Sequence, residues 1–112
     1  MSEQKEHVYE LTPTQLAEKL KSQPNTRLID IREQDEWEYC HIDGAEWMPM
    51  QSVPSRLAEL SQDDTLVLYC HHGSRSAFVL NFLHQKGYTD IAHLRGGIDA
   101  WARDIDPDMP TY

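Results

Sequence analysis

The amino-acid sequence predicts an α/β fold, in which an open sheet of mostly parallel strands, about five in number, carries helices on both faces. Three observations support this prediction. Short apolar segments alternate with segments of helical character along the chain. The segments 27–31 and 65–69 are mostly apolar, as in strands buried on both faces of a parallel sheet. No repeat, linker or low-complexity segment divides the 112 residues, so we expect a single domain over 1–112.

The first helix has the clearest start signal in the chain. Thr12 is a good N-cap residue, Pro13 suits the first helical position, and Gln15 completes a capping box with Thr12. We expect this helix to run to about Lys21, with a short edge strand at residues 8–10 before it.

The remaining elements follow in alternation. We expect strands at residues 27–31, 45–48, 65–69 and 91–94, and helices at residues 33–39, 54–60, from 75 to Gly87, and around 100–101. The helix from residue 75 should pack through an apolar stripe of Phe78, Val79, Phe82 and Leu83. Residues 1–7 and 104–112 are expected to form loose tails.

Charge and composition exclude several classes of partner. The net charge is −9, which disfavours nucleic acid and anionic membrane, because both require a basic surface. The sequence contains neither a run of about 18 apolar residues nor a signal-like start. Its two cysteines, Cys40 and Cys70, form no CxxC pair. We therefore expect a cytoplasmic protein with free thiols.

The segment from Cys70 to Ser76, with the sequence CHHGSRS, is the best candidate for a functional site. It joins the clearest strand to the best amphipathic helix, and ligands of α/β sheets bind at the carboxyl ends of the strands. Backbone N–H groups of such a loop can turn inward above the helix N-terminus and bind an anion. Gly73 permits the tight curvature, and Ser74 could cap the helix or donate its hydroxyl.

Cys70 is placed to be a nucleophile. A helix N-terminus and the positive charge of Arg75 should favour the thiolate, and His71 and His72 can add donors. The alternative is a buried cysteine that serves only as a small hydrophobic residue. The combination of strand end, glycine, arginine and hydroxyls favours catalysis or anion binding.

Three segments resemble the rhodanese family of sulfurtransferases. LIDIREQDEWEYCHIDGA, from Leu28, resembles the family pattern L-I-D-V-R-x-x-x-E-[FW]-x-x-G-H-I-x-G-A. YCHHGSRS resembles the family's active-site loop, and LRGGIDAW, ending at Trp101, resembles its closing L-x-G-G-I-x-A-W. The resemblance implies a rhodanese-like sheet and a sulfurtransferase that needs no cofactor. The family's cysteine takes a sulfane sulfur from thiosulfate or another small anionic donor, becomes a persulfide, and gives the sulfur to a thiol or cyanide-like acceptor, which can be a protein.

Carried over by position, the resemblance assigns a role to each matching residue. Cys70 would be the catalytic nucleophile and persulfide carrier. Asp30 and Arg32 match the family's D-x-R near the cleft, and we interpret them as a supporting ion pair. His41 matches a family histidine that we interpret as structural. The residues expected to form the substrate-binding cradle are His71, His72, Gly73, Ser74, Arg75 and Ser76.

Cys40 departs from the pattern, because the family usually has glycine there. We interpret it as a structural thiol; the alternative is a resolving cysteine that attacks a Cys70 persulfide. The spacing of Cys70, His71 and His72 fits no usual structural zinc signature, so no metal is expected.

Two other functions remain open on the sequence. The same thiol could serve a persulfide carrier or protein-interaction module with little turnover on free thiosulfate. A Cys-dependent phosphatase or arsenate reductase uses a related strand–loop–helix cup, but places arginine six positions after the cysteine. Arg75 lies five positions after Cys70, and position 76 is serine, which disfavours that alternative.

Overall fold

The structure is a computed structural model that describes residues 9–112; the expected tail at residues 1–7 lies outside the described residues. Five strands form one sheet in the order β1-β5-β4-β2-β3, and every pairing is parallel. The strands are β1 (Glu10–Leu11), β2 (Arg27–Asp30), β3 (Glu46–Trp47), β4 (Leu66–Tyr69) and β5 (Ile91–Leu94). The predicted α/β class is confirmed.

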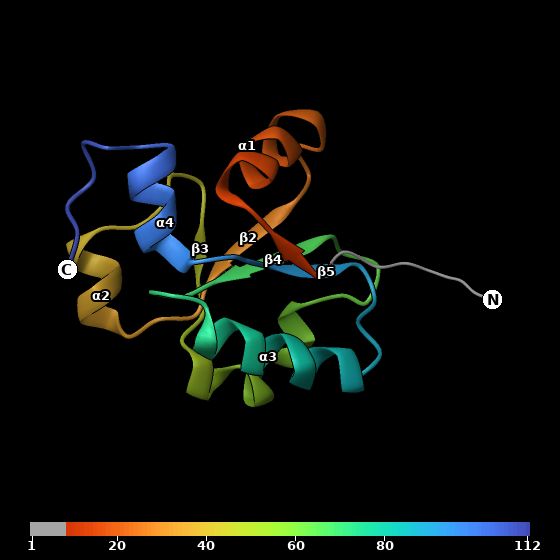
Figure 1. Cartoon of the computed structure of the whole chain (residues 1–112). Helices are drawn as coiled ribbons and strands as arrows, with labels where there is room; N and C mark the ends of the chain where they lie inside the picture. Colours follow the sequence, from red (N-terminus) through yellow and green to blue (C-terminus); the bar gives the residue numbers. More distant parts are fainter. Residues whose placement is uncertain (1–8) are drawn as a thin grey trace.

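Helices cover both faces of the sheet (Figure 1). The α-helices are α1 (Pro13–Ser22), α2 (Gln34–Tyr39), α3 (Ser74–Gln85) and α4 (Gly97–Asp104). A 3₁₀ helix, η3 (Pro54–Glu59), occupies the place of the helix predicted at 54–60, and a further 3₁₀ segment, η2 (Met50–Ser52), precedes it. In Figure 1, α1 and α4 lie above the sheet, and α3 lies below it.

Two apolar clusters, one on each face, follow the alternation of side chains along the central strands. On β4, Leu68 packs into the cluster with α3, whereas Val67 packs into the cluster with α1 and α4. On β2, Ile29 and Leu28 divide in the same way. The core therefore forms two layers, and the central strands are apolar at consecutive positions because each strand contacts both layers.

The start of α1 agrees with the sequence prediction. The Thr12 side chain accepts a hydrogen bond from the Gln15 backbone N–H, and the Gln15 side chain accepts one from the Thr12 N–H. Pro13 occupies the first turn, where its missing N–H costs no hydrogen bond.

The helix that follows the candidate loop differs in two details from the prediction. Gly73, with φ of +115°, is its N-cap residue, so Ser74 is the first helical residue and does not cap it. Phe78 was expected in the core, yet 69% of its surface is exposed. The buried positions are Ser76, Val79, Leu80 and Leu83. Their spacing of three to four residues defines the face toward the sheet and turns position 78 outward.

Residues 105–112 contain no helix or strand, but the segment is held against the domain. The Tyr112 hydroxyl accepts a hydrogen bond from Arg32, whereas the sequence led us to expect a loose tail. The reason is a long-range contact that no local sequence pattern encodes.

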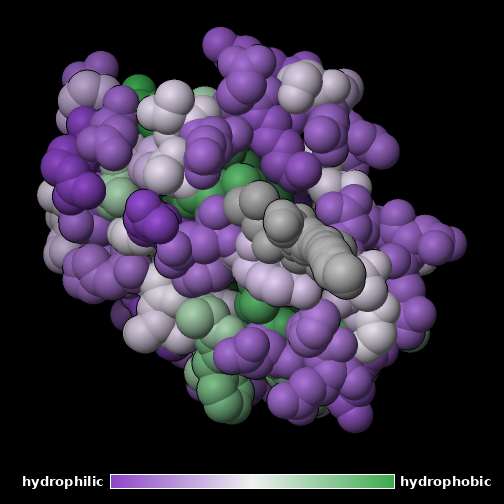
Figure 2. Space-filling view, turned by 45° about the vertical axis from the view of Figure 1, so that its right-hand side comes forward, coloured by the Kyte–Doolittle hydropathy of each residue, from purple (hydrophilic) through white to green (hydrophobic). Residues whose placement is uncertain are grey.

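The face of the molecule in Figure 2 is mainly hydrophilic. Figure 2 shows hydrophobic residues only in small patches on the face that it presents. None of the helices in residues 9–112 has the length and apolar character that crossing a bilayer requires.

Candidate active site

Cys70 directly follows β4, the central strand of the sheet. Tyr69 pairs with Asp30 on β2, so the end of β4 lies beside the segment that continues to Arg32. This register brings the Cys70 loop and the Asp-x-Arg segment to the same edge of the sheet, as parallel strands require. Only 1% of Cys70 is exposed, so its thiol lies beneath the loop that follows.

Two backbone donors and one side-chain hydroxyl surround the Cys70 sulfur. Its Sγ accepts hydrogen bonds from the backbone N–H of Gly73 at 3.1 Å and of Ser76 at 3.3 Å. The Ser76 hydroxyl oxygen lies 3.5 Å from Sγ. Both N–H groups belong to the N-terminal end of α3, where backbone donors lack intrahelical acceptors. The arrangement directs two backbone N–H groups at the sulfur from the start of a helix, as in sites that bind anions.

The Gly96-Gly97 turn supports the loop from behind. The backbone N–H of Ile98 donates to the Cys70 carbonyl at 2.9 Å, and that of Asp99 donates to the His71 carbonyl at 3.2 Å. A side chain at Gly97 would collide with these two carbonyl oxygens, and its φ is +62°. The glycine of the LRGGIDAW segment thus permits close contact between α4 and the cysteine loop.

Arg75 does not stand as an isolated positive charge. Its guanidinium donates to both carboxylate oxygens of Glu36, at 2.8 and 2.9 Å. These hydrogen bonds lower the pKa of Glu36 to about 2. Glu36 lies on α2, so the pair ties the start of α3 to that helix. The electrostatic effect of Arg75 on Cys70 therefore stays a prediction, and Glu36 offsets part of it.

Asp30 and Arg32 form an ion pair with both side chains fully buried. Arg32 Nη2 donates to Asp30 at 2.7 Å and to the Cys40 carbonyl at 2.6 Å. Burial opposes the charge, but the Asp30 carboxylate raises the pKa of the Arg32 guanidinium above its usual range. This pair holds the backbone after α2 through the Cys40 carbonyl, and its supporting role stays a prediction.

Tyr112 extends this network to the helix that carries Glu36. Its hydroxyl accepts from Arg32 Nη1 and donates to Glu36, each at 2.7 Å. A continuous set of hydrogen bonds therefore runs from Asp30 through Arg32, Tyr112 and Glu36 to Arg75. Nothing in the local sequence pointed to Tyr112, whereas Glu36 lies in the segment that resembles the family pattern.

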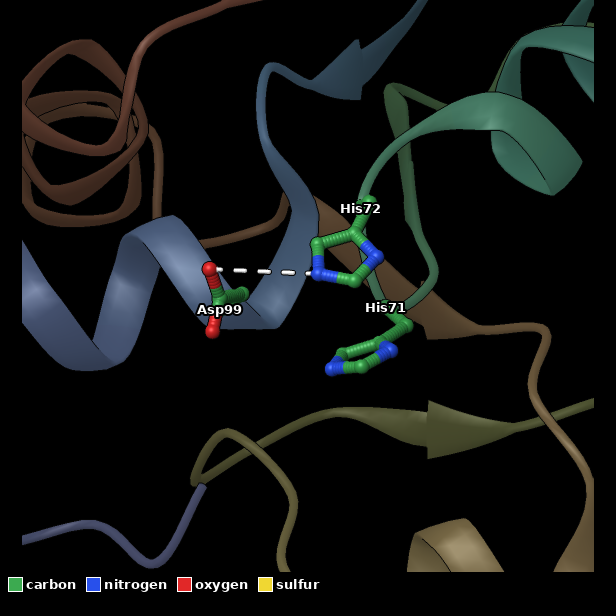
Figure 3. A group of neighbouring side chains, drawn as sticks. All are labelled: His71, His72 and Asp99. Atoms are coloured by element: carbon green, nitrogen blue, oxygen red, sulfur yellow. Dashed lines mark ion pairs between the residues drawn. The ribbon is translucent and has the colours of Figure 1, made fainter. Parts of the chain in front are cut away.

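The side chains of His71 and His72 contact residues other than the Cys70 sulfur. The His71 ring stacks on Tyr112 with centroids 3.9 Å apart, and its Nε2 lies 2.9 Å from the Tyr112 carbonyl oxygen. His72 is exposed and faces Asp99, with Nε2 3.9 Å from the carboxylate (Figure 3). Burial lowers the pKa of His71, and the neighbouring His72 does so as well. Of the six residues predicted to form the substrate-binding cradle, only Gly73 and Ser76 form hydrogen bonds with the Cys70 sulfur.

His71, His72 and Asp99 are residue types that can bind metal, and their candidate ligand atoms lie within 4.8 Å of one another. Asp99 is also paired with Arg103 at 3.6 Å, and the Tyr112 carbonyl occupies one nitrogen of His71. Nothing else in residues 9–112 supports a metal at this place. The sequence expectation of no metal stays a prediction.

Cys40 and His41 directly follow α2. The His41 ring stacks on Trp37 at 3.7 Å, and its Nδ1 lies 2.9 Å from the Trp37 carbonyl oxygen. Cys40 is half-buried and, like Cys70, is a free thiol. The structural roles expected of His41 and Cys40 stay predictions.

Sequence reasoning also missed His93, a buried residue of β5. Its Nδ1 lies 2.8 Å from the Ser76 hydroxyl, which itself borders the Cys70 sulfur. The available signal was a histidine in a strand whose other residues are apolar.

Two hollows flank the Arg75–Glu36 pair. One, of about 310 Å³, is lined by Met50, Ser74, Arg75 and Phe78. The other, of about 260 Å³, is lined by Asp35, Glu36, Tyr39 and Tyr112. The start of the cysteine helix thus borders open space on the side of Phe78.

Comparison with known proteins places this geometry in a family context. The family model described as Rhodanese-like domain matches residues 12–104. A sulfurtransferase from Allochromatium vinosum is 38% identical over 96 residues, which cover 86% of this chain and 90% of that protein. A crystal structure of a rhodanese-like domain protein from Staphylococcus aureus is 28% identical and superposes with a TM-score of 0.78, covering 84% of this chain and 91% of that chain.

A further relative is the probable adenylyltransferase/sulfurtransferase MoeZ of Mycobacterium tuberculosis. It is 45% identical over 104 residues, which cover 91% of this chain. The chain spans only 26% of the length of that relative. The similarity therefore concerns only part of a longer protein.

Proposed function

The chain belongs to the rhodanese-like domain family, and from this membership we propose that it is a sulfurtransferase with Cys70 as its sulfur-carrying nucleophile. It takes a sulfane sulfur from thiosulfate, or from another small anionic donor, and passes it to a thiol or cyanide-like acceptor. The observation that carries the proposal is the Cys70 sulfur, which accepts two backbone N–H hydrogen bonds at the start of α3.

The reaction proceeds in two steps. In the first step, the Cys70 thiolate attacks the outer sulfur of thiosulfate and forms a new S–S bond. The bond between the two thiosulfate sulfurs breaks, and its electron pair leaves with sulfite. In the second step, the acceptor attacks the outer sulfur of the persulfide, and the electron pair of the broken S–S bond restores the thiolate.

The N-terminus of α3 can donate hydrogen bonds to the persulfide as well as to the thiolate. The Gly73 and Ser76 N–H groups hold Sγ, and the first-turn N–H groups of Ser74 and Arg75 have no intrahelical acceptor. We assign these two groups to the outer sulfur. Donors fixed before the reaction stabilise the charge that develops on sulfur without reorganisation.

The burial of Cys70 favours a small donor. Because 1% of the residue is exposed, a donor that presents a single terminal sulfur is better suited than a bulky ester. The function also requires a free thiol, and both cysteines are free. A reducing compartment such as the cytoplasm maintains that state.

Loop length supports sulfur over phosphorus as the transferred atom. Phosphatase cups of the C-x5-R type place arginine one position later than Arg75. A tetrahedral phosphoryl group needs several oxygens bound at once, and the shorter loop offers fewer inward N–H groups. In addition, Glu36 engages both ends of the Arg75 guanidinium, which leaves that group less available for a bidentate grip on phosphate.

One experiment tests the proposal directly. The protein is incubated with thiosulfate, and its intact mass is measured before and after treatment with a reductant. We expect a gain of one sulfur atom that the reductant removes, and we expect turnover of thiosulfate with cyanide. Cys70→Ser should show neither, and Cys40→Ala should show both.

The same assay separates the alternatives. Formation of the persulfide with little turnover on cyanide would indicate a persulfide carrier for a protein partner. Equal efficiency on an aryl phosphate and on thiosulfate would contradict the argument from loop length. Full turnover by Cys70→Ser would refute the proposed function.

A further inference from the structure

His93 is a buried ionisable residue that the sulfur-transfer chemistry above does not use. It lies on β5, and only 8% of it is exposed. The β4–β5 register pairs His93 with Leu68, two residues before Cys70. Residues two apart in a strand point to the same face, so His93 and Cys70 both face α3. The helix supplies the residue that connects them.

Ser76 lies between the histidine and the cysteine. Its hydroxyl oxygen is 2.8 Å from His93 Nδ1 and 3.5 Å from Cys70 Sγ, and Ser76 itself is fully buried. On the other side of the ring, Nε2 lies 3.5 Å from the Glu10 carboxylate. A row of polar atoms therefore leads from the thiol to a side chain at the surface.

We propose that His93 accepts the proton of the Cys70 thiol through the Ser76 hydroxyl and so generates the thiolate. This inference rests on the proposed function only in taking Cys70 as the nucleophile. Because His93 acts through Ser76 and touches no substrate, it is a positioning residue that also stores the proton.

The proton balance is complete within these three residues. The S–H bond of Cys70 breaks, and its proton binds the Ser76 oxygen. The original hydroxyl proton of Ser76 moves to His93 Nδ1. The products are a thiolate and an imidazolium, with Ser76 unchanged, so no external base is consumed. The reverse transfer returns the proton when the thiol is restored.

His93 starts this transfer in its neutral form. Burial lowers the pKa of His93 below its usual value, and the carboxylate of Glu10 opposes that effect. With Nε2–H directed at Glu10, Nδ1 is free to accept from Ser76. The alternative acceptor for the Ser76 hydroxyl, the Gly73 carbonyl, is more distant at 3.2 Å.

The charged groups around His93 suit an imidazolium. From β1, Glu10 faces Nε2, and Arg95 partly offsets Glu10 through an ion pair of 3.0 Å. From β4 and the loop, Cys70 contributes the thiolate. From α3, Ser76 contributes a neutral hydroxyl. Two negative groups and one exposed arginine thus surround the ring, and the negative groups offset part of the cost that burial imposes on the imidazolium when Cys70 ionises.

Alkylation of Cys70 by iodoacetamide as a function of pH tests the inference without requiring sulfur transfer. The protein carries Cys40→Ala, so that only Cys70 reacts. The variants are His93→Leu, which removes the hydrogen bond, and His93→Asn, which keeps a polar group near Nδ1 but does not accept a proton. His41→Asn is the control. The His41 ring also has a hydrogen-bond partner, the Trp37 carbonyl oxygen, but it is not part of the set of hydrogen bonds that joins Cys70, Ser76 and His93.

We expect both His93 variants to move the pH midpoint of alkylation upward by about one unit, which is about a tenfold lower rate near neutral pH. The control should leave the midpoint unchanged. A purely structural His93 would be replaced adequately by asparagine, so a wild-type profile in His93→Asn would overturn the inference.

A second measurement uses wild-type protein and does not depend on the folding of any variant. The imidazole nitrogen resonances of His93 are followed by NMR as a function of pH, before and after alkylation of Cys70. Coupled titration requires the His93 midpoint to fall by about one unit when the thiolate is removed. Independent titration of the two groups would overturn the inference.

The outcomes also separate this inference from the proposed function. If wild-type protein gains no sulfur from thiosulfate while the two titrations remain coupled, the proposed function fails and the inference stands. If the persulfide forms at the same rate and pH midpoint in His93→Asn, the inference fails and the proposed function stands.

Discussion

The guanidinium of Arg75 donates to both carboxylate oxygens of Glu36, at 2.8 and 2.9 Å, and so joins the first turn of the cysteine helix to α2. The two side chains are 39 positions apart in the sequence. This contact makes the position of the active loop depend on a helix that contributes no atom to the sulfur site.

Glu36→Gln should make the free energy of unfolding less dependent on pH in the acidic range. The pKa of Glu36 is lowered from 4.5 to about 2, so its stabilising contribution is present above pH 4.5 and is lost as the pH falls toward 2. We expect the wild type to lose about 1 to 2 kcal/mol more than the variant across that window, allowing for partial exposure of Arg75. Urea unfolding at pH 7, 4 and 2.5 measures this difference. Identical pH dependence in both proteins would contradict it.

Gly97→Ala should disrupt the cysteine loop. A Cβ at this position collides with the carbonyl oxygens of Cys70 and His71. We expect loss of several kcal/mol of stability or, in folded protein, at least about a tenfold loss of persulfide formation. Gly44→Ala is a matched control, because Gly44 has a similar positive φ of +85° but open space around it. Comparable loss of persulfide formation in both variants would show that backbone strain, not contact with the loop, matters.

Tyr112→Phe should destabilise the domain by about 1 to 2 kcal/mol, because it leaves a buried Arg32 donor and Glu36 without their shared partner. Thermal and urea unfolding measure the change. Tyr39→Phe is the control: its hydroxyl donates only to the exposed Thr111 carbonyl, and we expect a change near zero. Equal stability of the Tyr112 variant and the wild type would show that the hydrogen-bonded network does not act as a unit.

Cys40→Ala should retain most of the thiosulfate turnover. The Cys40 group that contacts Arg32 is its backbone carbonyl, which the substitution preserves. Steady-state assay of the variant, together with the mass of its persulfide, tests the expectation. A large loss of turnover in folded protein would support the resolving role instead.

Local sequence was sufficient to predict the elements around the site. The apolar segments of β2 and β4, the capped start at Thr12 and the alternation of strands and helices follow from short-range chemistry, and all were confirmed. The position of Cys70 at a strand end followed as well, because a strand, a glycine loop and a helix are contiguous in the chain. The prediction that Phe78 is buried was wrong, because the rotation of α3 about its axis is set by the residues that pack between the helix and the sheet.

By itself, the sequence determined the fold class, the family pattern and the thiol that is the candidate nucleophile, since these depend on residues close together in the chain. Only the tertiary structure decided what surrounds that thiol. Three hydrogen-bonded pairs join residues that are 17 to 80 positions apart in the sequence: Glu36 with Arg75, Tyr112 with Arg32, and His93 with Ser76. Hydrogen bonds and burial between such distant residues arise only when the sheet register brings strands β1, β5, β4 and β2 side by side, and no local propensity encodes that arrangement.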